Sequence, residues 1–230
     1  MKNADKIAIA LDLKTEDEIF SLIKKINSYP VWLKIGLESF YRFGHSLIHV
    51  LHDQGFKIFL DLKLHDIPVT VHKALSAISH LPIDMINVHS LGGLEMMKEA
   101  KKAVELFPSK PKLIAVTWLT SHEESEIEKK MNQSFSQSIL TLAKDTKEAG
   151  LDGVVCSPKE ITLIKNICGP EFLLITPGIR LETQDKDDQK RILTPKEALD
   201  LGSHLLVIGR PITEAKNPQL VLEQILESFS

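Results

Sequence analysis

The chain has 230 residues, of which 43% are hydrophobic and 26% are charged, and its formal net charge at pH 7 is −3. This composition is typical of a soluble globular protein that buries a sizeable core. The sequence has no basic stripe and no polybasic segment, so we expect no nucleic-acid partner and no membrane partner.

Short apolar runs alternate with helical patterns along the whole chain. Runs rich in Ile, Leu and Val predict strands buried on both faces, and they cover residues 7–12, 31–36, 57–63, 85–90, 112–119, 153–156, 173–179 and 205–209. Apolar residues at steps of three and four predict helices between them, over residues 15–26, 94–107, 136–150, 158–169, 194–202 and 217–229. Thr15 and Glu18 have the spacing of a capping box, which marks the start of the first helix.

Eight predicted strands that alternate with helical segments predict a parallel sheet. Eight such units in 230 residues fit a single (β/α)8 TIM barrel of the α/β class. A doubly wound open sheet is the structural alternative, but no G-x-G-x-x-G follows the first strand, which disfavours dinucleotide binding. No linker or change in composition divides the chain, so we expect one catalytic domain over residues 1–230.

The two cysteines and the amino-terminal segment predict a cytoplasmic protein. Cys156 and Cys168 form no CxxC pair and no metal-ligand spacing, so we expect reduced thiols. The first apolar run ends at Asp12, is too short for a transmembrane helix and lacks a small-residue cleavage site.

Charged residues gather where the second and third predicted strands end, and a parallel barrel forms its active site at the carboxyl ends of its strands. Asp61 and Lys63 in "FLDLKLHDIP" lie two residues apart and so share one face of the strand. Asp66 follows directly, and Lys34 on the neighbouring strand extends the pair to a Lys–Asp–Lys row. Because burying such charges costs free energy, the cluster indicates a chemical role.

Each polar residue also has a purely structural interpretation. Asp66, directly before Ile67 and Pro68, has the sequence of a helix N-cap, and Asp12 has that of a turn at the barrel rim. His89 is interpreted as a hydrogen-bonded core histidine rather than a base, and residues 122–130 as a solvated segment. We expect no metal site at the three histidines with helical spacing, which are His45, His49 and His52.

A second group of residues, after the last two strands, has the features of a phosphate site. Gly209 and Arg210 directly follow the eighth strand, where TIM barrels commonly bind phosphate. Glycine permits close approach of the backbone, and arginine binds phosphate through two parallel hydrogen bonds. Residues 180–191 are long, polar and charged, which fits either a solvated loop or a lid that closes over the phosphate.

The segment "DLKLHDIPVT" (61–70) resembles the D-x-K-x-x-D-I-P-x-T signature of the orotidine 5′-phosphate decarboxylase family. Other segments similar to that family stand around it in the right order, namely "ALD" (10–12), "LKIG" (33–36), "VTWLTS" (116–121), "PGIR" (177–180), "DDQKR" (187–191) and "IGR" (208–210). The resemblance spans the chain. Leu64 and Val69 depart from the Phe and Asn of many bacterial members, but neither departure touches a charged position.

The resemblance implies decarboxylation of orotidine 5′-monophosphate to UMP, the last step of de novo pyrimidine nucleotide synthesis, without a metal ion or an organic cofactor. Lys63 would protonate the carbanion left at C6, and Asp61 would crowd the substrate carboxylate. Lys34 would orient Asp61 and bind a ribose hydroxyl. The other implied substrate-binding residues are Asp12 at the ribose, Thr120 at the pyrimidine, Gln189, Gly209 and Arg210 at the phosphate, and Arg180 in the same set.

The resemblance also implies a homodimer of barrels, in which Asp66, Ile67 and Thr70 reach into the partner's site. One alternative is a related sugar-phosphate decarboxylase or synthase, which shares D-x-K-x-x-D but binds Mg²⁺ through a glutamate on the second strand. Lys34 occupies that position here, and a lysine repels the metal. A second alternative, a phosphate-binding barrel without catalysis, has no need of the charged cluster.

Overall fold

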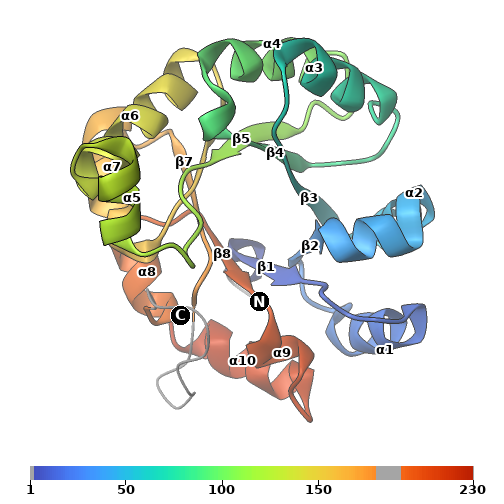
Figure 1. Ribbon diagram of the computed structural model, residues 1–230. Coiled ribbons are helices and arrows are strands. Elements are labelled where there is room, and N and C mark those ends of the chain that lie inside the picture. The colour runs from blue at the N-terminus through green and yellow to red at the C-terminus, as the bar shows by residue number, and fades with distance from the viewer. Residues whose placement is uncertain (1–2, 180–192, 230) are drawn as a thin grey trace.

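The protein, described by a computed structural model over residues 3–179 and 193–229, is a closed barrel of eight parallel strands (Figure 1). The strands pair in chain order, and β8 closes the barrel against β1. They are Ile7–Ala10 (β1), Trp32–Gly36 (β2), Lys57–Leu64 (β3), Met85–His89 (β4), Lys112–Val116 (β5), Gly153–Val155 (β6), Leu173–Thr176 (β7) and Leu205–Ile208 (β8). The predicted (β/α)8 TIM barrel is therefore confirmed, and the open-sheet alternative is wrong.

Helices follow the strands and form a ring around the barrel (Figure 1). They are Glu16–Ile26 (α1), Leu37–Asp53 (α2), Pro68–Ala77 (α3), Leu94–Val104 (α4), Glu124–Met131 (α5), Phe135–Glu148 (α6), Ile161–Cys168 (α7), Pro195–Leu201 (α8), Arg210–Thr213 (α9) and Pro218–Glu227 (α10). Within the described residues, none of these helices has the length and apolar character needed to cross a membrane.

Local signals mark most element starts correctly, and strand ends less well. The capping box of Thr15 and Glu18 is present at the start of α1. The fifth and seventh strands were predicted to extend to residues 119 and 179, but they end at Val116 and Thr176. The helix over 37–53, in which Gly44 has a φ of 65°, was not predicted as an element. The solvated segment 122–130 is in fact largely helical, as α5, and mostly exposed.

Alternate residues of the first strands separate the barrel interior from the layer beneath the helices. Ile7 and Ile9 belong to the large outer core, whereas Ala8 belongs to a smaller inner cluster with Phe59. On β1 and β3 the next inward positions, Ala10 and Asp61, line the cavity above that cluster. The inner cluster therefore forms an apolar floor, and the position above Phe59 is the charged Asp61.

Polar side chains close the opposite, amino-terminal rim in a repeated manner. Asp84, Asp152 and His204 each directly precede an even-numbered strand, β4, β6 and β8. Each accepts a hydrogen bond from the second backbone N–H of the preceding odd-numbered strand, at 2.8, 2.9 and 3.1 Å respectively. These bonds satisfy amides at the barrel end that lies away from the charged cavity.

Candidate active site

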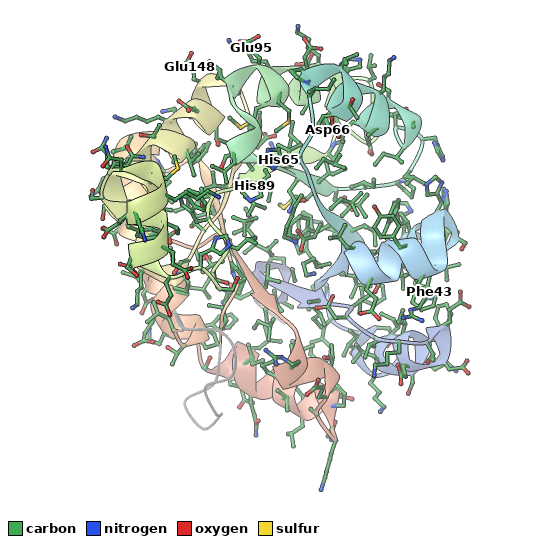
Figure 2. All side chains as sticks on the ribbon, viewed as in Figure 1. Phe43, His65, Asp66, His89, Glu95 and Glu148 are labelled. Atoms are coloured by element: carbon green, nitrogen blue, oxygen red, sulfur yellow. The ribbon has the colours of Figure 1, made fainter. Side chains whose placement is uncertain are left out.

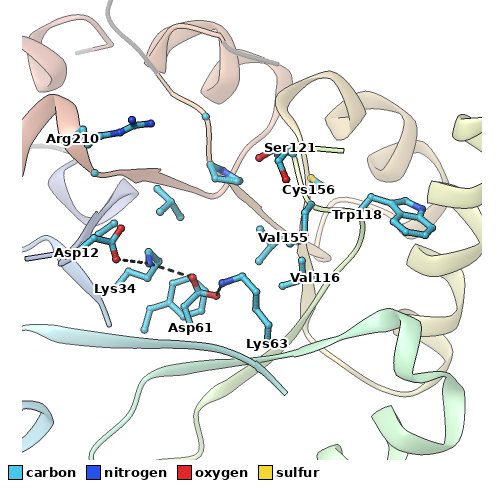
Figure 3. A pocket seen from close by; sticks show the side chains of 18 of the residues that line it. Asp12, Lys34, Asp61, Lys63, Val116, Trp118, Ser121, Val155, Cys156 and Arg210 are labelled. Atoms are coloured by element: carbon cyan, nitrogen blue, oxygen red, sulfur yellow. Dashed lines mark ion pairs between the residues drawn. The ribbon is translucent and has the colours of Figure 1, made fainter. Parts of the chain in front are cut away.

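A cavity of about 520 Å³ lies at the carboxyl ends of the strands (Figure 3). It brings together most of the residues that the sequence singled out, which are Asp12, Lys34, Asp61, Lys63, Thr120, Gly209 and Arg210. Arg180, Gln189 and the loop interpreted as a lid lie outside the described residues. The cavity thus joins the charged strand ends to the segment that follows β8.

Four side chains of alternating charge form a continuous row along one wall of the cavity (Figure 3). Lys34 Nζ lies 3.7 Å from Asp12 Oδ1 and 3.2 Å from Asp61 Oδ2. Lys63 Nζ lies 2.7 Å from Asp61 Oδ1. Lys34 and Asp61 are buried, whereas Asp12 at the outer end of the row is exposed.

Asp61 stays ionised although it is buried. Burial alone raises the pKa of this carboxyl, but the charges of Lys34 and Lys63 lower it. Hydrogen bonds from Lys63 and Asn87 act in the same direction, so the pKa of Asp61 lies below its ordinary value. The site therefore holds a buried carboxylate between two lysine side chains.

A glycine makes room for this row. Gly36 pairs with Asp61 in the β2–β3 ladder. A Cβ at position 36 would lie 3.2 Å from Lys34 Nζ and 3.3 Å from Asp12 Oδ1, closer than most real Cβ contacts. The absence of a side chain at Gly36 thus leaves the ion pairs their space.

Asp61 and Lys63 both line the cavity and lie in contact, but the regular strand from which their shared face was predicted is not present. Leu60 pairs with Ile86 and Leu64 with Val88, so β3 advances four residues while β4 advances two. Lys63, within this bulge, has a φ of 51°, in the left-handed region that residues other than glycine seldom adopt. The bulge directs the Lys63 ammonium to the Asp61 carboxylate.

Sequence reasoning missed several residues of the site. Val116 and Val155 line the cavity near Lys63 and supply an apolar wall (Figure 3). Cys156 also lines it, and burial, with the charge of Glu160, raises the pKa of its thiol well above the ordinary value. Asn87 is fully buried beneath the row. The one available signal was an asparagine between apolar neighbours in a predicted strand.

Asp66, Ile67 and Thr70 lie apart from this cavity, in the part of the chain that the structure describes. All three side chains are exposed at the start of α3, and Figure 2 shows Asp66 beside that helix. Asp66 does not cap α3, because the N-cap is Ile67. Its Oδ1 instead accepts a hydrogen bond from the Ile67 amide at 2.7 Å.

His89 at the end of β4 is a hydrogen-bonded, partly buried histidine, as the sequence predicted. Its Nδ1 accepts a hydrogen bond from the Leu91 amide at 3.3 Å, and its ring stacks on His65 with centroids 5.5 Å apart (Figure 2). Burial, followed by the charges of His65, Lys63 and His122, lowers its pKa to about 4. His89 is therefore neutral at pH 7.

This neutral histidine makes stability depend on pH. The unfolded chain protonates His89 near its ordinary pKa of 6.5, whereas the folded chain resists the proton until about 4. The contribution of His89 to the free energy of unfolding is thus full above 6.5 and is lost as the pH falls to about 4. We expect His89→Asn, whose amide oxygen still accepts the Leu91 N–H, to flatten this pH dependence in urea unfolding.

The control is His204→Asn, at a second histidine whose pKa burial lowers. It is expected to flatten the pH dependence of the free energy of unfolding as well. That result would show that the assay detects the titration of a single histidine. A His89→Asn profile that runs parallel to the wild type would contradict the assignment.

Comparison with known proteins places this cavity in a family. Residues 5–225 match the family described as orotidine 5′-phosphate decarboxylase / HUMPS. The chain belongs to that family. It is 47% identical to an orotidine 5′-phosphate decarboxylase of Staphylococcus epidermidis over 96% of both chains. It is also 47% identical to one of Pseudoalteromonas translucida, over 99% of this chain and 98% of the relative.

The fold agrees with that of a solved orotidine 5′-phosphate decarboxylase. The crystal structure of orotidine 5′-phosphate decarboxylase from Lactobacillus acidophilus superposes with a TM-score of 0.84 at 39% identity. The superposition covers 97% of this chain and 98% of that one. Sequence and architecture thus identify the same family over nearly the whole chain.

Proposed function

We propose that the protein decarboxylates orotidine 5′-monophosphate to UMP, the last step of de novo pyrimidine nucleotide synthesis in the cytoplasm. The relatives with this name and the row of alternating charges in the cavity support the proposal. The observation that carries it is the Lys63 ammonium, held 2.7 Å from a buried carboxylate at the mouth of the barrel.

The chemistry follows from this arrangement. The bond between C6 and the carboxylate breaks, CO₂ leaves, and the electron pair remains on C6. Lys63 Nζ then gives its proton to C6, so a C–H bond replaces the lost C–C bond. A fixed cation beside the developing carbanion stabilises it most where water is excluded. Val116 and Val155 supply such an apolar wall.

The remaining residues of the row bind and orient. Lys34 holds Asp61 by an ion pair of 3.2 Å and reaches toward Asp12, where the ribose hydroxyls are proposed to bind. Thr120 on the cavity wall contacts the pyrimidine. Gly209 and Arg210 bind the phosphate, together with Gln189 and Arg180, and this remote contact supplies binding energy for the reaction.

The dimer is part of the same proposal. Tyr41 on α2, and Ile67 and Val69 at the start of α3, expose 81%, 62% and 51% of their surface. A neighbouring groove between α2, β3 and α3 is apolar as well, with Leu37, Leu62, Leu64, Ala74 and Ile78 among its residues. A second barrel on this face covers these side chains and brings its own Asp66, Ile67 and Thr70 to the cavity.

Lys34 separates this function from that of the Mg²⁺-dependent relatives. A metal site at this place needs a carboxylate on β2, and the Lys34 ammonium occupies that position 3.2 Å from Asp61. Among the described residues, no group of three or more His, Cys, Asp or Glu side chains is arranged to hold a metal ion.

Activity without a metal is the direct test. We expect the purified protein to remove the orotate absorbance band of orotidine 5′-monophosphate at the same rate with and without EDTA. A sugar-phosphate substrate is the comparison, and it should give no CO₂. Loss of the band that EDTA abolishes, or no loss at all, would overturn the proposed function.

A further inference from the structure

Asn87 joins the Asp61 side chain and the Lys63 backbone of β3 through a single buried amide. It lies in the middle of β4 and is fully buried between Ile86 and Val88. Its Nδ2 donates a hydrogen bond to Asp61 Oδ1 at 2.6 Å. Its Oδ1 accepts one from the Lys63 backbone N–H at 2.7 Å.

The backbone bond matters because of the bulge in β3. Between the pairs at Leu60 and Leu64 the regular ladder to β4 is interrupted, so the Lys63 amide is supplied with a side-chain partner. The same residue has a φ of 51°. A left-handed residue within a strand persists only where its surroundings hold it. The Asn87 oxygen is the contact that holds the amide of Lys63 in this conformation.

The carboxylate bond sets the orientation of Asp61. Oδ1 accepts from both Asn87 and Lys63 Nζ, while Oδ2 faces Lys34. Rotation of the carboxylate would break the bond to Asn87. Asn87 thus holds the plane of the Asp61 carboxylate between Lys34 and Lys63, and it does so without adding charge. Its partner across the β4–β5 ladder, Ile114, is apolar.

We infer that Asn87 is a positioning residue for the proposed proton transfer: its amide fixes the Lys63 backbone and the Asp61 carboxylate together, so that the Lys63 ammonium is aimed into the cavity. The inference rests on the proposed function. It predicts that loss of the amide affects the chemical step and spares the distant binding of phosphate, since Gly209 and Arg210 belong to another segment.

The test compares Asn87→Leu, which keeps the size of the side chain and removes both bonds, with the wild type. We expect kcat to fall about 100-fold, the effect of a small misplacement of a catalytic group. KM and the Kd of UMP should change less than about 3-fold, because these interactions are weighted toward the phosphate end. Thr146→Val is the matched control, because it removes a buried hydrogen bond to Leu142 on α6, away from the cavity.

Asn87→Asp gives an independent readout if the leucine variant folds poorly. A protonated Asp at this position reproduces both bonds, whereas an ionised one faces the Asp61 carboxylate. The charged residues that face position 87 are Asp61 and Lys63 on β3, and Lys34 lies beyond them on β2. We expect kcat of this variant, relative to the wild type, to recover as the pH is lowered.

The outcomes are distinguishable. If the wild type does not decarboxylate orotidine 5′-monophosphate, the proposed function is wrong, whereas the hydrogen bonds of Asn87 to Asp61 and Lys63 are unaffected by that result. If the wild type is active and Asn87→Leu keeps kcat within about 3-fold, the inference is overturned. A parallel loss of kcat, UMP affinity and thermal stability would also overturn it, because that pattern indicates a structural role alone.

Discussion

Replacing Lys63 with alanine is expected to abolish turnover and leave the barrel folded. The substitution removes the proposed proton donor and the cation beside the carbanion, effects that together amount to at least about 10⁴-fold in kcat. The fold should survive, because Asp61 keeps its ion pair with Lys34 and its hydrogen bond from Asn87. Loss of the orotate absorbance band measures turnover, and circular dichroism measures folding.

Lys57→Ala is the matched control for this experiment. Lys57 begins the same strand at its other end, is exposed, and lies over the Trp32 ring at 5.0 Å. Its removal should leave kcat unchanged. Turnover of Lys63→Ala within about tenfold of the wild type would remove the proton-donor role.

Mixing two inactive proteins is expected to restore activity if the dimer shares its sites. Lys63→Ala and Asp66→Ala subunits are each proposed to be inactive, for different reasons. In a mixed dimer, one site receives both defects and the other receives neither. A random mixture of equal amounts should therefore recover about a quarter of the wild-type activity, since half of the dimers are mixed and one site in each is intact.

The control mixture combines Lys63→Ala with Asp61→Ala. These residues lie in one cavity of one chain, 2.7 Å apart, so no mixed dimer contains an intact site. This mixture should stay inactive. If the first mixture is equally inactive after subunit exchange has been shown by mass spectrometry, Asp66 does not act across an interface.

The barrel could be predicted because its signals are local and repeated. Apolar runs such as 205–209 recur in every unit, stop signals such as Gly150 end several helices, and each can be recognised without knowledge of the others. The helix over 37–53 was missed, since it contains Gly44, and a glycine inside a segment resembles the stop signal that ends other helices. Strand ends were overestimated where apolar residues such as Trp118 continue past the last ladder bond.

The site could be predicted only in part. Charges at the ends of predicted strands pointed to Lys34, Asp61 and Lys63, because the carboxyl ends of parallel strands meet. The bulge at Lys63 and its support by Asn87 could not be foreseen, since both depend on the register between β3 and β4. Register is a property of two strands, and each strand read alone does not contain it.

The Lys34 ammonium lies between the carboxylates of Asp12 and Asp61, at 3.7 and 3.2 Å. This one residue also decides whether the site repels or attracts a metal ion, which matters for how such barrels evolve. A lysine codon becomes a glutamate codon by a change of one base. Lys34→Glu would leave three carboxylates around one point, and such a set attracts a divalent cation in place of the lysine charge. A single amino-acid substitution therefore separates a metal-free site from a metal-binding site on this barrel.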